Sequence, residues 1–475
     1  MARPQTPPPA GPAPSAPKIE SLNTKDMRRV LGSSLMGSII EYYDFILYAT
    51  AAALVFDKVF FSNLTPSVAL FASFGTLAVG YVARPLGGIV FGHYGDVLGR
   101  KQMLVISMLM MGGATIAIGV LPTTAQIGIA APIILVLLRF VQGISVGGEW
   151  GGATLMAVEH APPSKRGFAA AFANAGGPAG GLIATLVVSG TSAATGDQFL
   201  VWGWRIPFLL SAVLIIVGMV VRLKVAETPV FQALEAQAVE KRDRIKTPLG
   251  KVISRFPRIV VITLVASLGF YTMQGILTSW GVSVAVAEGV DRSFVLNIKG
   301  VAAVITIATC FAAARLSDRF GRRAVLAVGG VAGALWAFPA LQLMHSGEAW
   351  DFALAVLVGN GLIQGVLAGP IGAYISEQFP PEVRYTGASL AYQGASTLGA
   401  GFTPMIASAL VVAGGGGFQL VGVFWIAVLV LGLVAVAMSR EGADSQQSKR
   451  AARSKPARPT SMEPDHGKNG RLQDA

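Results

Sequence analysis

The 475-residue chain is poor in cysteine, histidine and charge. A single cysteine, Cys310, excludes an intrachain disulfide framework and any metal site built from several thiolates. The four histidines, His93, His160, His345 and His466, lack the spacing of metal ligands. Charged residues make up 13% of the chain, against about 25% in a typical soluble protein. We therefore expect no metal and no resident cofactor, and the low charge argues against a soluble fold.

Apolar residues make up 53% of the chain and gather in long runs. A run of about 20 residues crosses the roughly 30 Å core of a bilayer as a helix. The runs are continuous rather than alternating, which favours helices over a closed barrel. Twelve spans are predicted, at about 29–56, 66–91, 103–121, 127–150, 167–192, 203–221, 259–286, 294–314, 324–344, 352–376, 387–413 and 418–438.

Basic residues are distributed unequally among the predicted loops. With the N-terminus inside, the outer loops contain only Lys58 and Arg292, whereas the tails and inner loops hold most of the 37 Lys and Arg. This asymmetry predicts a multi-pass protein of the plasma (inner) membrane with both termini cytoplasmic. Basic loops beside anionic lipid also account for the net charge of +12, so we expect the bilayer as partner and no nucleic acid.

The predicted fold class is an all-α integral membrane protein with twelve transmembrane helices in two six-helix bundles. The bundles are assigned to residues 29–221 and 259–438, and a cytoplasmic connector to 222–258. Residues 1–28 and 439–475 are polar or proline-rich and are interpreted as disordered cytoplasmic tails. Since one chain carries both bundles, we expect it to function as a monomer.

A ten-residue phrase occurs twice, as GHYGDVLGRK at 92–101 and ARLSDRFGRR at 314–323. Repetition at half-chain spacing between apolar runs indicates duplication and places both copies at cytoplasmic helix ends. An aspartate there can pair with arginine or with the partial charge of a helix end, so we interpret both copies as gates that hold the cytoplasmic side shut. The alternative is that their basic residues only fix topology.

The predicted gating residues belong to these phrases and their surroundings. Val97 replaces the basic residue that the second copy has at Arg319, which predicts a weaker first gate. The full set is Gly92, Asp96, Gly99, Arg100, Lys101, Glu149, Asp318, Arg319, Gly321, Arg322, Arg323, Glu377 and Arg384. Glu149 is expected to share a charge network with the repeated phrase.

Two acids, Glu41 and Asp44, lie deep in the first predicted span. Carboxylates at such depth are costly and are functional by default, and a change of surroundings can load or release a proton. Arg139 in the fourth span lies at similar depth and is the expected partner of Asp44. Its fork of donors can also bind a substrate carboxylate. We therefore predict proton coupling through Asp44, Glu41 and Arg139, with a purely structural ion pair as the alternative.

Further polar residues within the spans are candidates for substrate binding. The predicted set is Arg139, Gln142, Tyr43, Tyr271, Gln274, Lys299, Asn360, Tyr392 and Gln393. Arg84, beside Pro85, is interpreted as a helix-packing residue. The sequence has no paired histidines, no HExxH and no GxSxG, so we predict no catalytic residues and no enzyme. The absence of a Walker-type phosphate loop argues against an ATP-driven pump.

The repeated phrase resembles the signature G-x-x-x-D-[RK]-x-G-R-[RK] of the major facilitator superfamily. Within it the chain is similar to the metabolite:proton symporters, on EYYDFILY (41–48), RPLGGIVFGHYGDVLGRK (84–101), LRFVQGISVGGEWGGA (138–153), GWRIPF (203–208) and SEQFPPEVRYTGASLAYQ (376–393). AAALVF (51–56), GGEWGGA and FTP (402–404) resemble the shikimate transporter branch. Tyr42 departs from the pattern, which usually has Trp there.

The resemblance implies a secondary active transporter that works by alternating access. It implies symport of protons with a small organic acid such as shikimate, or a related carboxylate or zwitterion, with the proton as coupling ion. Asp44 aligns with the acidic position that related sugar porters use for proton coupling. The alternatives are an uncoupled facilitator or exporter of small metabolites and, from other classes, a membrane enzyme or a transporter-like sensor.

Overall fold

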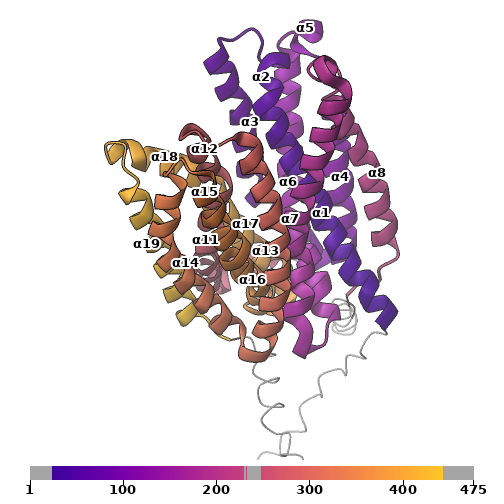
Figure 1. Ribbon diagram of the computed structural model, residues 1–475. Helices are drawn as coiled ribbons and strands as arrows, with labels where there is room; N and C mark the ends of the chain where they lie inside the picture. The colour runs from indigo at the N-terminus through magenta and orange to yellow at the C-terminus, as the bar shows by residue number, and fades with distance from the viewer. Residues whose placement is uncertain (1–23, 229–231, 233–247, 442–475) are drawn as a thin grey trace, which may run out of the picture.

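The computed structural model describes residues 24–228, 232 and 248–441. Of the predicted tails, residues 1–23 and 442–475 lie outside the described residues, whereas 24–28, expected to be disordered, already belong to the first helix. About half of the predicted connector, 229–231 and 233–247, also lies outside them. The described part of the chain contains helices and no strand, arranged as two bundles (Figure 1). The predicted all-α fold class is confirmed.

Six long helices build the N-terminal bundle. They are α1 (Thr24–Leu54), α3 (Pro66–Leu98), α4 (Arg100–Val120), α6 (Ala130–His160), α7 (Arg166–Thr195) and α8 (Arg205–Leu223). Short turns α2 (Phe56–Val59), α5 (Thr124–Ile127), η1 (Pro163–Lys165) and η2 (Gly196–Phe199) lie between them.

The C-terminal bundle has six further spans, of which three contain a π-helical segment. The continuous ones are α13 (Arg292–Phe320), α14 (Arg322–Met344) and α19 (Gln419–Met438). The interrupted ones are α11–η3–α12 (Pro257–Gly275, Ile276–Trp280, Gly281–Ala287), α15–η4–α16 (Ala349–Val356, Leu357–Gln364, Gly365–Glu377) and α17–η6–α18 (Arg384–Ser396, Thr397–Gly401, Thr403–Ala413). The 3₁₀ turn η5 (Pro381–Val383) precedes α17, and α10 (Pro248–Arg255) precedes α11.

Ten of the described helical stretches have the length and hydropathy of a membrane span, and α1 and α3 complete the set of twelve. The sequence places several ends too early. The second and eighth spans continue through most of the repeated phrase, to Leu98 and Phe320. Only Gly99 and Gly321 separate these helices from the next ones, with φ of 110° and 103°. Since L-residues with side chains rarely adopt such angles, both turns require glycine.

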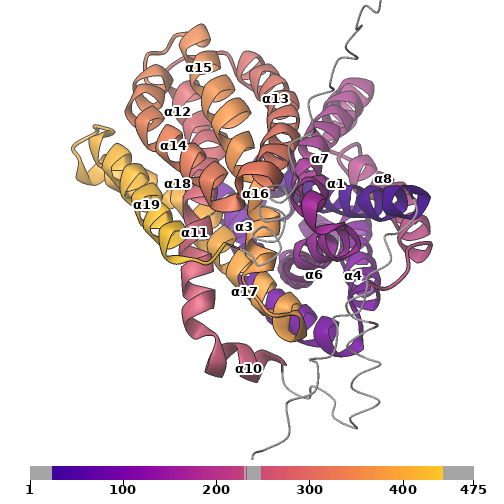
Figure 2. The same cartoon turned by 90° about the horizontal axis from the view of Figure 1, so that it is seen from below.

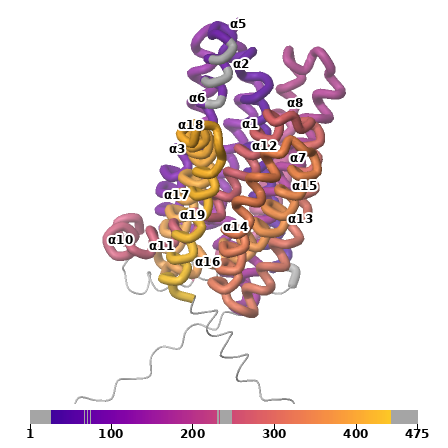
Figure 3. Tube along the Cα trace, turned by 60° about the vertical axis from the view of Figure 1, so that its left-hand side comes forward, coloured from indigo at the N-terminus to yellow at the C-terminus, as the bar shows by residue number. Residues whose placement is uncertain are grey.

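The two bundles meet along a seam where α3 and α6 pack on α17, and α7 packs on α13 and α16. Both copies of the repeated phrase lie at one end of the molecule, which we call the motif face. The described chain begins and ends at this same end (Figure 1). Viewed from that end, most N-terminal helices lie on one side and most C-terminal helices on the other, while α3 runs alongside α17 of the C-terminal bundle (Figure 2). Helix α10 lies beside the motif-face ends of the spans, at the edge of the molecule (Figure 3), and contacts α3 and α17.

Candidate transport pocket and gates

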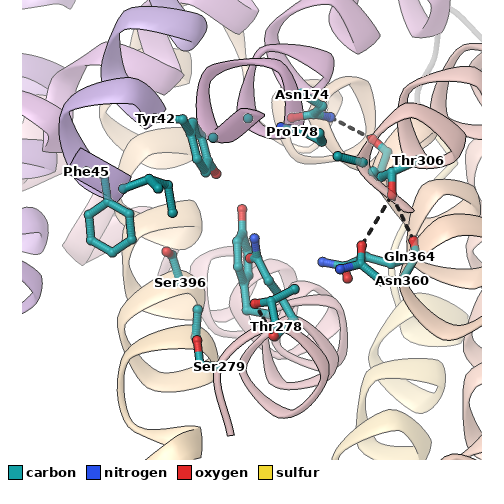
Figure 4. Close-up of a pocket in the computed structure, with 18 of the residues that line it drawn as sticks. Tyr42, Phe45, Asn174, Pro178, Thr278, Ser279, Thr306, Asn360, Gln364 and Ser396 are labelled. Atoms are coloured by element: carbon teal, nitrogen blue, oxygen red, sulfur yellow. Dashed lines mark hydrogen bonds between the residues drawn. The ribbon is translucent and has the colours of Figure 1, made fainter. Parts of the chain in front are cut away.

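A cavity of about 270 Å³ lies between the bundles at mid-depth. Tyr42 and Phe45 of α1 face it from one side, and Thr278, Asn360 and Ser396 come from the C-terminal bundle (Figure 4). Its volume lies just below the range of about 300–1,000 Å³ typical of sites for drug-sized ligands. The pocket therefore suits a small metabolite.

Five of the nine predicted substrate-binding residues line this pocket: Tyr271, Gln274, Lys299, Asn360 and Tyr392. The Lys299 ammonium donates to the Thr278 carbonyl at 2.9 Å. Asn360 accepts a hydrogen bond from Thr306 at 3.2 Å. The C-terminal bundle thus supplies the polar groups that the sequence assigned to it.

The other four predicted residues, Arg139, Gln142, Tyr43 and Gln393, do not line the pocket. Tyr43 points into the N-terminal bundle and donates to the Pro207 carbonyl at 2.8 Å. Gln393 donates to the backbone carbonyls of Val146 and Gly147 across the seam, at 3.2 and 3.1 Å. Their predicted pocket positions are wrong because neighbouring helices cover those faces.

Arg84 lines the pocket, contrary to its interpretation as a packing residue. Its guanidinium lies over the rings of Phe45 and Tyr81, 4.7 and 4.5 Å from their centroids. Arg84 and Lys299 are the two charged residues among the described pocket lining, and that lining contains no Asp or Glu. The pocket therefore presents positive charge from both bundles. Sequence reasoning missed Tyr42, Asn174 and Thr306 as lining residues, whereas Gln364, on the same span as Asn360, is a lining candidate from the sequence and does line the pocket.

Asp44 and Arg139 are joined through two intermediate side chains and make no direct ion pair within the described structure, which corrects the expected contact. Arg139 Nη1 donates to Gln142 Oε1 at 3.3 Å, and Gln142 Nε2 donates to Thr115 Oγ1 at 2.7 Å. Thr115 Oγ1 donates to Asp44 Oδ2 at 2.7 Å. All four side chains are buried. This relay lies inside the N-terminal bundle, with the Arg139 guanidinium 4.1 Å from the ring centroid of Tyr48.

An aromatic stack closes the pocket toward the motif face. The rings of Trp150 and Tyr392 are parallel within 10°, with centroids 3.4 Å apart across the seam. Asn174 accepts from Trp150 Nε1 at 3.0 Å and donates to the Ala368 carbonyl of the other bundle at 2.6 Å. A solute moving from the pocket to the motif face must separate these contacts.

At the motif face, each repeated aspartate caps a helix of the opposite bundle. Asp96, near the end of α3, accepts from the backbone N–H groups of Tyr385 and Thr386 at 3.3 and 3.0 Å, and from the Thr386 hydroxyl at 2.8 Å. Asp318, near the end of α13, accepts from the N–H groups of Gly167 and Phe168 at 2.8 and 2.9 Å. Negative charge at a helix N-terminus is favourable, so both contacts hold the bundles together.

The arginines of the repeat join these caps to glutamates at helix ends. Arg100 pairs with Glu159 at 3.2 Å, and Arg322 pairs with Asp318 at 2.7 Å and Glu377 at 3.2 Å. Arg384 crosses the seam to Glu159 at 3.3 Å. Sequence reasoning missed Glu159, although a second repeat signals it: EHAPPSKR at 159–166 parallels EQFPPEVR at 377–384.

Of the remaining predicted gating residues, some lie against the opposite bundle and others contact only their own bundle or solvent. Gly92 lies against the backbone of Thr386, where a Cβ atom has no room. Lys101 donates to the Leu223 carbonyl and Arg323 to the Ala437 carbonyl, within their own bundles. Arg319 is exposed beside its neighbour Phe320 and makes no ion pair among the described residues, so the charge contact that Val97 was expected to lose is absent from the second copy as well. That position points away from the seam in both copies.

Glu149 contacts Arg222 of α8 and the Ser107 hydroxyl, not the repeated phrase. The expected charge network with the motif is therefore wrong. Arg222, placed by the sequence at the start of the connector, lies inside α8 and is 3% exposed.

Replacing Asp96 by Asn is expected to separate the bundles at the motif face. The change removes the negative charge that caps α17 and places an amide N–H donor beside two backbone N–H donors. The contact between the bundles thereby loses about 0.3–2 kcal/mol of stabilisation. Asp318→Asn is expected to have a smaller effect, since it breaks two inter-bundle hydrogen bonds rather than three. Electron–electron distance measurements between spin labels on α3 and α17, in a Cys310→Ala background, check this. Val97→Asn is the matched control, and a distance distribution for Asp96→Asn identical to wild type contradicts the prediction.

Comparison with known families agrees with this architecture. The model of the Major Facilitator Superfamily matches residues 35–392 and 301–467. The chain belongs to the major facilitator superfamily. It is 40% identical to the inner membrane metabolite transport protein YhjE of Escherichia coli over 87% of this chain and 94% of that protein. It is 37% identical to the Escherichia coli shikimate transporter, covering 91% and 98% of the two chains.

More distant members of the superfamily share its function class and fold. A proline/betaine transporter of Salmonella typhimurium is 32% identical over 81% of this chain and 78% of that protein. The proton:xylose symporter XylE, solved with a bound bromodeoxyglucose, superposes with a TM-score of 0.72 at 18% identity, over 90% of this chain and all of that one. This chain is therefore a multi-pass membrane transporter of a small molecule, not an enzyme, and the predicted twelve-helix fold is confirmed.

Proposed function

We propose that this protein is a proton-coupled symporter that takes up a small organic acid of the shikimate type. The observation that carries the proposal is the charge of the pocket, lined by Arg84 and Lys299 and by no described acid. Arg84 offers a planar fork of donors that suits a carboxylate. Tyr42, Gln274 and Asn360 offer hydrogen-bonding groups for hydroxyls on the same molecule.

An acid is favoured over a quaternary ammonium zwitterion by the aromatic groups of the pocket. Recognition of such a cation uses exposed faces of aromatic rings. Here one face of Trp150 is covered by Tyr392 at a centroid distance of 3.4 Å. The nearby cations Arg84 and Lys299 would also repel a quaternary ammonium group. We therefore place betaines below hydroxylated carboxylates, although three relatives carry the name of a proline/betaine transporter.

Alternating access accounts for the position of the contacts. Among the described residues, the inter-bundle hydrogen bonds and ion pairs lie at pocket depth or between the pocket and the motif face. With the motif face cytoplasmic, as the basic loops indicate, this conformation is closed to the cytoplasm. Protonation of Asp44 would release the Thr115 hydroxyl and so alter the hydrogen bonds that connect Asp44 to Arg139. We propose that this rearrangement couples proton binding to the conformational change.

Uptake into proteoliposomes tests the proposal. Radiolabelled shikimate, quinate, citrate, proline and glycine betaine are offered with an imposed pH gradient, alkaline inside. We expect shikimate or quinate to accumulate above its external concentration, and collapse of the gradient to abolish accumulation. Equal counterflow with and without the gradient identifies an uncoupled facilitator instead. Accumulation of betaine but of no acid overturns the proposed substrate class.

Asp44→Asn is expected to abolish accumulation while exchange of labelled for unlabelled substrate continues. The amide keeps an acceptor for Thr115 but cannot carry the proton. Gradient-driven uptake and exchange are measured on the same vesicles, and Arg139→Ala is expected to behave alike. Full uphill uptake by either variant contradicts the assignment of the relay.

A further inference from the structure

The two acids of α1 point to different places. Tyr42, Phe45 and Ile46 line the pocket, and Glu41 lies one turn from Phe45 on that side of the helix. Asp44 instead bonds Thr115 inside the N-terminal bundle. Although they are three residues apart, Glu41 and Asp44 therefore belong to different surroundings.

Glu41 is buried without full hydrogen bonding. It is 3% exposed, and its Oε2 atom has no hydrogen-bond partner among the described residues. An ionised carboxylate in such a place is costly, because burial disfavours its charged form. A protonated Glu41 has no such cost, so this residue is suited to binding a proton.

The charged and titratable groups that face Glu41 come from several helices. They are Arg84 of α3, Arg222 of α8, Glu149 of α6, and the tyrosines Tyr42, Tyr271 and Tyr392 of α1, α11 and α17. Helix α7 approaches α1 through glycines, Gly176 and Gly180, and brings no charge there. Arg222 is already paired with Glu149. Arg84 is the cation on the pocket side of Glu41, since its guanidinium lies 4.7 Å from the centroid of the Phe45 ring, one helical turn along α1.

Arg84 makes no ion pair within the described structure, and its guanidinium is held only over two aromatic rings. It therefore lies between two possible anions, Glu41 behind the pocket wall and the substrate in front of it. Inside the protein the attraction between opposite charges is stronger than in water. An ionised Glu41 thus offsets the positive potential that a substrate carboxylate would meet.

We infer that Glu41 is a proton-binding site separate from Asp44, and that its ionised form competes with the substrate anion for Arg84. This inference rests on the proposed function. Substrate binding then draws a proton onto Glu41, and release of that proton weakens binding. The chain would carry two coupling carboxylates with distinct tasks, Glu41 for affinity and Asp44 for conformational change.

The test is the pH dependence of binding to the purified full-length protein, measured by calorimetry. The probe is shikimate or, if another acid of the uptake panel accumulates more, that acid. Between about pH 5.5 and 8.5 the acid stays anionic, and we expect the wild-type Kd to rise with pH by up to about tenfold per unit. Glu41→Gln is expected to bind tightly at every pH, with no proton taken up on binding. Glu41→Asp is expected to restore a pH dependence.

Asp44→Asn is the matched control, a carboxylate three residues away that is expected to keep the wild-type slope. Retention of the full slope by Glu41→Gln overturns the inference but leaves the proposed function intact. A flat profile in Asp44→Asn also overturns it, since one site would then account for both effects. If the wild-type protein binds none of the acids, the proposed function itself fails. Thermal unfolding of each variant confirms that the folded protein is being compared.

Discussion

Replacing Arg84 by alanine is expected to weaken uptake of the organic acid by about a hundredfold or more. Arg84 is the pocket cation with a fork of donors, and each charge-assisted hydrogen bond contributes about 1.5–3 kcal/mol. Two such bonds to one carboxylate correspond to at least two powers of ten in affinity, at about 1.4 kcal/mol for each. The measurement is the KM of uptake in proteoliposomes, together with the Kd of the purified protein.

Arg139→Ala is the matched control, because Arg139 is a second arginine within the same bundle, buried where Arg84 is half-buried, and does not line the pocket. We expect Arg139→Ala to lose accumulation with little change in Kd, and Arg84→Ala to lose binding. Arg84→Lys keeps the charge but not the fork, so an intermediate Kd is expected. Wild-type affinity in Arg84→Ala would contradict the assignment of the pocket.

Replacing Arg222 by alanine is expected to destabilise the N-terminal bundle by about 3–5 kcal/mol. The change leaves the Glu149 carboxylate, 1% exposed, without its cation inside the bundle. It also removes the hydrogen bond to the Leu104 carbonyl, 2.6 Å long. Thermal unfolding in detergent and the yield of monodisperse protein measure the effect.

The double variant Arg222→Met with Glu149→Leu separates charge from packing. Replacing both members of a buried ion pair by apolar residues is often neutral, whereas removing one is not. We expect the double variant to be more stable than Arg222→Ala. If Arg222→Ala is as stable as the double variant, the Glu149 carboxylate is not destabilised by losing Arg222, and the prediction is contradicted. Gly37 packs directly on this pair, so enlarging that residue should destabilise the same region.

Length and continuity of the apolar runs were sufficient to predict twelve spans and the all-α fold. This is because each segment must by itself be long and apolar enough to cross the bilayer core, and must satisfy its own backbone hydrogen bonds there. The repeated phrase located both copies of the motif because its residues lie at helix ends in each half. Its helical extent was not foreseen, since polar residues beyond the apolar core can continue a helix at the membrane surface.

The lining of the pocket could be predicted only in part. Arg84 and Arg139 both interrupt apolar runs, and the sequence does not say which of them faces the other bundle. That depends on how each helix is rotated by its neighbours. Gly80, for example, leaves room for the Arg139 guanidinium inside the N-terminal bundle. The three π-helical segments could not be predicted from the sequence either, because their i→i+5 hydrogen bonds depend on tertiary packing.

The two aspartate caps are reciprocal: Asp96 of the first half holds α17, and Asp318 of the second half holds α7. A rigid rotation that opens the motif face must break both together, so their free energies add and their equilibrium factors multiply. If each cap contributes about 0.3–2 kcal/mol, the pair favours the closed state by a factor of about 3 to 900. Because the phrase is duplicated, two modest contacts break cooperatively, and together they stabilise the closed state more than either contact does alone.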